Sequence, residues 1–296
     1  MKRFCISALL ILIISKGIAQ QIFTSSLYDM QGMLHNPSTA GSLQKGMVGA
    51  SYRSQWSGIS GSPRTATVFG SVDLPSQKIG LGGYIFSDKT GPTARTGMEI
   101  AFAKHIPLNN DARFSLGIEA RGEQFSIDKE KLSSLGNDPV LAGTGNKFVF
   151  DAGFGISYTS KTLQLGASVS QLIQSKLNLY SGTAALSEEG RLYRHYYFHG
   201  LYHWRVDNNT TITPNFLFIY LPNAPLDFIG GVRVEYKELV WFGVGTRARQ
   251  SINLSTGINI NKKFSIGYAF DIYRTPLSFY DNGADAHEIL MRYNIF

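Results

Sequence analysis

The feature that most constrains this chain is an alternation of apolar and polar residues, which recurs in segments of about ten residues from Met47 to Phe296. Segment 112–124 is the clearest example. One parity holds Phe114, Leu116, Ile118 and Ala120, and the other holds Arg113, Ser115, Gly117, Glu119, Arg121 and Glu123. Successive side chains of a strand point to opposite faces, so this pattern predicts strands with one apolar and one polar face.

An export signal precedes the first predicted strand. A basic start is followed by an apolar run, residues 6–14, and by small residues suited to cleavage, Gly17-Ile18-Ala19. The run is shorter than the roughly 20 residues that span a bilayer, so we expect residues 1–20 to be a cleaved signal peptide. The only cysteine, Cys5, leaves with it. We therefore expect no disulfide, thiolate metal site or catalytic cysteine in the mature chain.

Composition narrows the class further. The chain holds 15 Tyr, 19 Phe and 31 Gly, while only 17% of its residues are charged. Such a balance is typical of β-barrels rather than of helical domains. The formal charge of +7 loses three units with Lys2, Arg3 and Lys16, which leaves +4. This excess is weak, and no basic cluster or nucleic-acid motif accompanies it, so we expect no nucleic-acid partner.

The alternating segments amount to about fourteen candidate strands. Short connections with turn residues, such as Pro75-Ser76-Gln77 and Asn261-Lys262-Lys263, alternate with longer ones such as 87–94, 125–146 and 172–190. Outer-membrane barrels carry short turns at the periplasmic rim and long loops at the other. We predict an all-β, antiparallel transmembrane outer-membrane β-barrel, with both termini on the periplasmic side.

The chain divides into three parts on this prediction. Residues 1–20 are the signal peptide, and residues 46–296 form a single barrel domain. Residues 21–45 lie outside the strand rhythm and contain the turn signal Asn36-Pro37. We expect this segment either to hang in the periplasm or to plug the barrel lumen.

Parity also predicts which side chains meet lipid. Met98, Ile100 and Phe102 face outward on one segment, which avoids the cost of about 2–4 kcal/mol for a charge near the bilayer midplane. Charged residues of both signs face inward: Glu99, Arg113, Glu119, Arg121, Glu123, Arg233, Glu235, Glu288 and Arg292. They could tune a channel or pair with one another to fill the lumen. We favour an occluded lumen because the opposite signs can pair.

The histidines are the strongest candidates for a metal-binding or catalytic site, but their spacing argues against such a site. His195, His199 and His203 share one parity of a predicted strand, where four residues span about 13 Å, too far for two of them to share an ion. His287-Glu288 lacks the second histidine of a zinc protease, and no Gly-x-Ser-x-Gly motif is present. We expect no metal site, no cofactor and no enzymatic activity.

The residues that break the alternation resemble those of a known family. They are Asn36-Pro37-Ser38-Thr39-Ala40-Gly41, Tyr52-Arg53-Ser54-Gln55-Trp56 with Gly58, Asp73 with Gly80-Leu81-Gly82, the Asp88…Gly91 turn and the closing His287-Glu288-Ile289…Tyr293. Together they resemble the PorP/SprF family, outer-membrane proteins of the type IX secretion and gliding motility machinery of Bacteroidetes. The likeness covers nearly the whole mature chain.

The resemblance implies a barrel in the cell outer membrane that docks, or helps to secrete or anchor, one cognate surface protein. That substrate would be a large adhesin with a C-terminal sorting domain. The resemblance also implies contacts with the type IX translocon and with periplasmic components, besides outer-membrane lipid. The candidate partner-binding residues are Asn36, Pro37, Gly41, Arg53, Gln55 and Trp56.

Two alternatives stay open. The first is an outer-membrane channel or porin for small solutes, which the inward charges would tune. The second concerns Trp56 and Arg53, which could be an aromatic-belt tryptophan at the membrane interface and its capping arginine rather than partner contacts.

Overall fold

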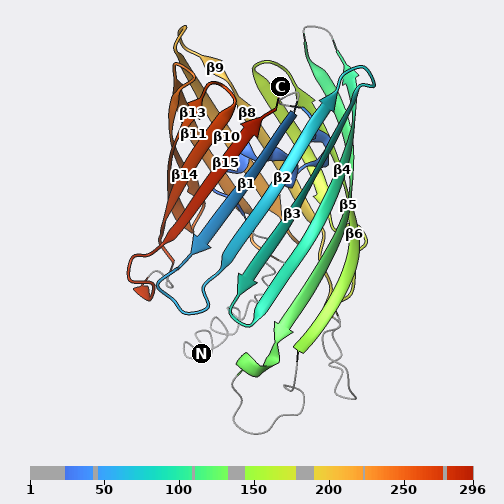
Figure 1. The fold of residues 1–296 in the computed structure, drawn as a ribbon, viewed down its shortest axis with the longest axis vertical. Coiled ribbons are helices and arrows are strands. Elements are labelled where there is room, and N and C mark those ends of the chain that lie inside the picture. The colour runs from blue at the N-terminus through green and yellow to red at the C-terminus, as the bar shows by residue number, and fades with distance from the viewer. Residues whose placement is uncertain are drawn as a thin grey trace, which may run out of the picture.

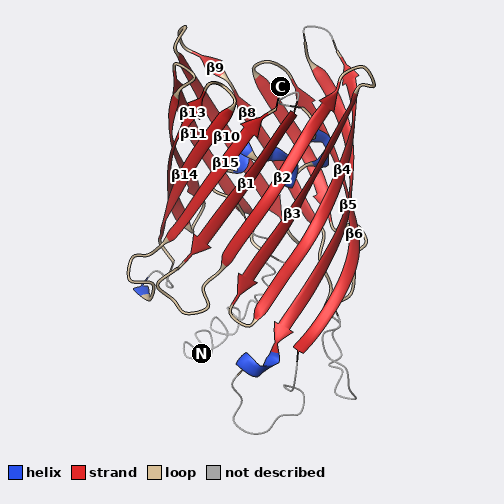
Figure 2. Cartoon of the chain, viewed as in Figure 1, coloured by secondary structure: helices blue, strands red, loops and turns tan. Residues whose placement is uncertain are grey.

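The chain forms a closed barrel of tilted antiparallel strands, as Figure 1 and Figure 2 show. The structure is a computed structural model that describes residues 24–42, 46–108, 111–132, 144–177, 190–222, 224–275 and 279–295. Within these ranges no helix is long and apolar enough to cross a membrane. The expected signal peptide, residues 1–20, lies outside the described residues.

Every strand of the described chain except the two-residue β9 pairs with two neighbours, so the sheet closes on itself. The strands are β1 (Gly46–Gln55), β2 (Arg64–Leu74), β3 (Ile79–Thr90), β4 (Thr93–Pro107), β5 (Arg113–Asp128), β6 (Thr144–Thr159), β7 (Leu163–Ser170), β8 (His195–Tyr202), β9 (Trp204–Arg205), β10 (Thr210–Tyr220), β11 (Asp227–Tyr236), β12 (Val240–Arg247), β13 (Ser251–Ile260), β14 (Phe264–Tyr273) and β15 (Ala286–Asn294). Only His203 separates β8 from β9, and both pair with β10, so they make one of fourteen barrel strands. The pairs β1–β15 and β10–β11 complete the ring. The predicted antiparallel barrel is confirmed, and its closure satisfies the backbone hydrogen bonds that a bilayer demands.

The two rims of the barrel differ in their connections. The rim that we call the short-turn rim carries residues 75–78, 160–162, 206–209, 237–239 and 261–263, together with the connection from β4 to β5. At the opposite, long-loop rim lie the ends of the strands joined by the connections β1–β2, β3–β4, β5–β6, β7–β8, β10–β11, β12–β13 and β14–β15. In barrels of this class the short turns face the periplasm, so the long-loop rim faces the cell exterior.

One predicted loop is wrong. Residues 87–94 do not form a long connection, because β3 continues to Thr90 and β4 begins at Thr93. Gly91 adopts the left-handed conformation with φ of +56°, and this allows the chain to reverse within a two-residue turn. The alternation weakens there because the ends of these strands are polar on both faces.

The predicted faces agree with the observed exposure. Met98, Ile100 and Phe102 are 52%, 61% and 40% exposed, on the surface that lipid covers in a membrane. Their inward neighbours Glu99 and Ala101 are 2% and 0% exposed. The lumen-facing side chains are therefore packed rather than bathed in a wide aqueous pore.

The N-terminal segment accounts for this packing, because residues 24–42 lie inside the barrel. Figure 2 shows its helical turns behind the near wall, within the ring of strands. At one end, Arg247 beside the long-loop rim donates a hydrogen bond of 2.6 Å to Thr24. At the other end, Arg113 beside the short-turn rim donates to the carbonyl oxygens of Gly41 and Ser42. We call residues 24–42 the plug.

The two ends of the described chain lie at opposite rims. Near the C-terminus, the backbone N–H of Ile295 donates to the carbonyl of Gly46 at the short-turn rim, where a periplasmic terminus was expected. The described chain begins at Thr24, beside the long-loop rim. The plug therefore runs the length of the lumen before β1 starts.

Candidate functional site

The plug consists of three short turns that bury its apolar side chains. They are the 3₁₀ turns η1 (Tyr28–Met30), η2 (Gly32–Leu34) and η3 (Pro37–Thr39). Leu27, Met30 and Met33 are 2–4% exposed and pack in one apolar cluster with wall residues that include Phe69 and Trp241. Turns this short have little stability of their own, so the barrel wall must hold their shape.

Asn36 and Pro37 organise the turn η3. The Asn36 side chain accepts a hydrogen bond of 3.0 Å from the backbone N–H of Ser38, and Pro37 occupies the first turn, where a missing N–H costs nothing. The other end of the Asn36 amide contacts the wall: Nδ2 lies 3.0 Å from both the Ile156 carbonyl and His199 Nε2. One side chain thus caps the turn and fixes it to the wall.

Five glycines let the wall accept the plug so closely. At each of them an added Cβ would come closer than 3.0 Å to an atom of the plug, a distance that real Cβ atoms essentially never show. These residues, which we call the glycine wall, are Gly80, Gly82, Gly117, Gly155 and Gly166. This contact explains the Gly80-Leu81-Gly82 element and shows that several strand glycines serve close packing.

Gly155→Ala tests this packing. The new methyl group would meet Asn36 and Pro37, and we expect it to lower the free energy of unfolding by about 1–3 kcal/mol, as overpacking of a filled interior does. Urea titration of the protein in lipid vesicles measures the change. Gly243→Ala is the matched control, because there the nearest atom is the rotatable Ser255 hydroxyl. Equal destabilisation by the two variants would contradict the role of the glycine wall.

A buried ion-pair cluster lines the β4–β5 wall. Arg121 lies 3.1 Å from Glu119 and 3.5 Å from Glu123, and it also pairs with Glu99 at 2.5 Å. Arg95 pairs with Glu123 at 2.7 Å. All three carboxylates are at most 5% exposed. The inward charges on this wall therefore pair, as their mixed signs predicted.

A second cluster joins the plug to β1, β14 and β15. Arg53 forms ion pairs with Asp271 and, at 3.2 Å, with Glu288. From the plug, Ser25 donates to Glu288, while the Ser26 hydroxyl donates to Asp271 at 2.7 Å. The cluster links strands distant in sequence to the start of the plug.

The structure places the six candidate partner-binding residues in two groups. Asn36 is fully buried, Pro37 is buried with it, Gly41 has φ of +66° beside Asp73, and Arg53 is 8% exposed. These four hold the plug, and a partner could reach them only after the plug moved. Gln55 and Trp56 are half-buried at the long-loop rim.

The rim residues connect two loops. Trp56 has a left-handed backbone with φ of +52°, and its backbone N–H donates to the carbonyl of Asp285 at 2.5 Å. The centroid of its ring lies 5.2 Å from that of Tyr273. The Gln55 backbone N–H donates to the Pro63 carbonyl at 3.0 Å. The family-like Tyr52–Trp56 element thus ties loop 56–63 to loop 274–285.

The three histidines do not converge. His195 Nδ1 lies 2.8 Å from the Tyr193 carbonyl, His199 contacts Asn36, and His203 Nδ1 lies 3.1 Å from Thr213 Oγ1. Among the described residues no group of three or more His, Cys, Asp or Glu could hold a metal ion. Each histidine is a local hydrogen-bonding group of the lumen.

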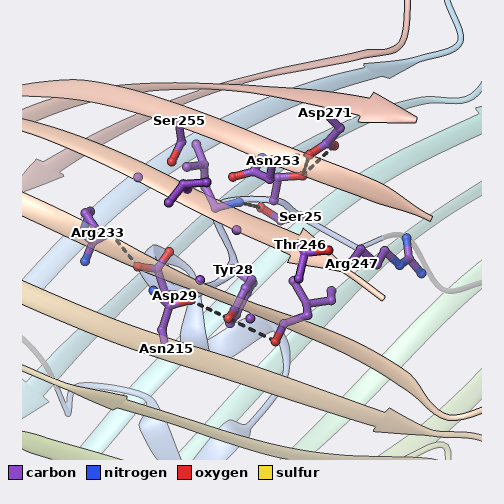
Figure 3. A pocket seen from close by; sticks show the side chains of 18 of the residues that line it. Ser25, Tyr28, Asp29, Asn215, Arg233, Thr246, Arg247, Asn253, Ser255 and Asp271 are labelled. Atoms are coloured by element: carbon purple, nitrogen blue, oxygen red, sulfur yellow. Dashed lines mark hydrogen bonds and ion pairs between the residues drawn. The ribbon is translucent and has the colours of Figure 1, made fainter. Parts of the chain in front are cut away.

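A pocket separates the plug from the β10–β14 wall (Figure 3). The plug contributes Ser25, Tyr28 and Asp29, and the wall contributes polar and charged residues such as Asn215, Arg233 and Asn253. Asp29 pairs with Arg233 at 2.6 Å, and Tyr28 donates to Asn215 at 2.6 Å. Sequence reasoning missed Asp29 and this pocket. Asp29 precedes the first strand, so no periodicity marks it.

Together these features define an outer-membrane β-barrel whose lumen is filled by its own N-terminal segment. Residues 17–293 match the family model described as type IX secretion system membrane protein PorP/SprF. The chain belongs to the PorP/SprF family, which confirms the resemblance of the sequence motifs.

Solved structures support the fold alone. The Ralstonia pickettii toluene transporter TbuX superposes with a TM-score of 0.54 at 10% identity, covering 90% of this chain and 93% of that one. A Pseudomonas aeruginosa FadL homologue gives a TM-score of 0.51 at 10% identity, with 88% and 93% covered. The CymD monoaromatic hydrocarbon channel gives 0.51 at 11% identity, with 94% of each chain covered. No curated protein sequence matches the chain significantly.

Proposed function

We propose that this barrel docks a secreted surface protein that the type IX machinery delivers, without any enzymatic activity of its own. The docked protein is an adhesin-type substrate held through its C-terminal sorting domain, and the short-turn rim contacts the translocon and periplasmic components. Family membership supports this role. The observation that carries it is the plug, fixed by Arg113 at one rim and by Arg247 at the other, since a filled barrel is better suited to docking than to diffusion.

The docking surface that we propose lies at the long-loop rim. Loop 274–285 carries two exposed aromatic side chains, Phe279 at 86% and Tyr280 at 74%. The same loop packs against loop 56–63, because Gly58 lies so near Asp281 that a Cβ there would clash with its carbonyl. Exposed aromatics on a supported loop are typical anchors of protein interfaces.

Deleting the gene tests this function. We expect the surface display of at least one type IX-secreted protein to be lost, while uptake of small dyes and antibiotics across the outer membrane stays unchanged. Wild-type protein should restore display, and the double variant Phe279→Ser, Tyr280→Ser should not. Phe242→Ser is a matched control, because Phe242 is 65% exposed on the barrel wall. Normal display of every secreted protein in the deletion strain would overturn the proposal.

A second candidate function, a channel for small solutes, has one observation in its favour. The pocket beside the plug holds the charged residues Arg53, Arg233 and Arg247, and it reaches toward the long-loop rim. A channel would give steady conductance from the purified wild-type protein in a planar bilayer, whereas a docking barrel with a fixed plug would give none.

A further inference from the structure

The wall that faces the pocket is built like the glycine wall but is not covered by the plug. Three of its lumen-facing residues are glycines: Gly231 on β11, with Gly243 and Gly245 on β12. At each of them the atoms nearest to an added Cβ come from neighbouring strands, and none comes from the plug. This second glycine surface borders empty space.

The charged groups around the pocket are already paired. Arg233 pairs with Asp29, Arg247 pairs with Asp227 at 2.5 Å, and Arg53 pairs with Asp271. A ligand would therefore find hydrogen-bonding groups here without an unpaired charge to neutralise. An anion or a cation would have to displace an existing ion pair.

One hydrogen-bond donor is left over beside the pocket. Trp241 lines the pocket and is 1% exposed, and its indole Nε1–H has no hydrogen-bond partner among the described residues. Buried donors are normally satisfied, and those that are not call for an explanation. The indole N–H is covered by protein atoms, so a peptide carbonyl accepts from it only after a shift of the Trp241 ring.

The filled wall shows what such a surface accepts. There the glycines admit the polypeptide backbone itself: Gly117 lies against the backbone of Pro37 and Ser38, and Gly80 lies against the carbonyl of Ala40. A surface without Cβ atoms allows a chain to approach closely, and carbonyl and N–H groups bring no net charge. The glycine surface beside the pocket has the same features.

We propose that this pocket is a second binding site, which takes a short extended segment of small, uncharged residues from the protein that docks at the long-loop rim. The segment enters past Arg247 and Ser251, which line the pocket beside that rim, and lies over Gly243 and Gly245. This inference rests on the proposed function for the identity of the docked protein. It adds that docking inserts a peptide beside the plug.

A single-cysteine variant tests the site, because the only cysteine of the chain, Cys5, is in the expected signal peptide. Ser255 lines the pocket, and the Ser255→Cys variant is labelled with a membrane-impermeant maleimide on intact cells. We expect labelling at least tenfold slower in cells that secrete normally than in cells with a disabled type IX translocon. Ser57→Cys, on the exposed loop, should label rapidly in both strains. Thr256→Cys, on the lipid-facing parity, should stay unlabelled in both.

A variant that fills the pocket provides a second test, independent of the cysteine labelling. Ser255→Leu puts bulk into the pocket, and we expect at least a tenfold loss of substrate retained at the surface, with the amount of folded barrel unchanged. Leu254→Phe adds bulk on the lipid face, where Leu254 is 47% exposed, and should retain the substrate as the wild type does.

The outcomes separate the two proposals. If display depends on the barrel, but the Ser255→Cys variant labels equally in both strains and the Ser255→Leu variant retains the substrate, the peptide site is wrong and docking stands. If the Ser255→Cys variant is protected in both strains and becomes reactive after purification, a small diffusible molecule such as a saccharide occupies the pocket, and the peptide proposal is overturned. Normal display without the barrel refutes docking itself.

Discussion

Replacing Arg121 with methionine is expected to lower the free energy of unfolding by about 3–5 kcal/mol, the usual cost of leaving a buried charge without its partner. Arg121 is the shared counter-ion of Glu99, Glu119 and Glu123. Without it Glu99 and Glu119 keep no cationic partner among the described residues, and Glu123 keeps only Arg95. Urea unfolding in lipid vesicles measures the loss.

Two further variants make this result specific. Arg64→Met removes an arginine from an exposed position on β2 and should change stability by less than about 0.5 kcal/mol. Adding Glu99→Gln and Glu119→Gln to Arg121→Met removes the uncompensated charges and should recover much of the loss. If Arg121→Met were no more harmful than Arg64→Met, the cluster would not stabilise the barrel.

Removing the plug is expected to convert a barrel that conducts no ions into an open, ion-conducting pore. Residues 24–42 bury Leu27, Met33 and Asn36 against the inner wall, and a fourteen-strand barrel is intermediate between small side-chain-filled barrels and porins of 16–18 strands. We expect the wild-type protein to give no steady current in a planar bilayer. The variant lacking residues 24–42 should give a stable, ohmic conductance.

A point variant guards against loss of folding in the deletion. Gly117→Leu places bulk against the backbone of Pro37 and Ser38, so it should displace the plug locally and produce intermittent openings. Val244→Leu, on the lipid-facing side of β12, is the control and should stay silent. Circular dichroism verifies that both the deletion variant and the Gly117→Leu variant form the barrel. If neither folded variant conducted ions, occlusion by the plug would be contradicted.

The barrel wall was predictable because its rule is local. A strand with lipid on one side must alternate with a period of two, so Met98, Ile100 and Phe102 reveal their face from sequence alone. The pairing of inward charges followed from the same parity, since Glu99, Glu119 and Arg121 had to share a lumen. The turn at Gly91 was missed because the polar ends of β3 and β4 resemble a loop.

The contacts of the plug were not predictable, because they join residues far apart in the chain. Nothing near Gly155 indicates that its missing side chain makes room for Asn36, 119 positions earlier. Arg53 was a candidate because it belongs to the family-like Tyr52–Trp56 element. In the structure it pairs with Asp271, and only the closed barrel brings these strands together. The Asn36–Gly41 element, a candidate partner contact from its family-like sequence, lies in the plug and contacts the wall inside the lumen.

The central claim is that this barrel holds a secreted protein at the cell surface. Native complexes purified from outer membranes through a tag in an exposed loop, and identified by mass spectrometry, test it most directly. We predict that a protein with a type IX C-terminal sorting domain co-purifies with the barrel and is lost with the Phe279→Ser, Tyr280→Ser variant. Recovery of the barrel without any such protein, from cells that secrete normally, would contradict the claim.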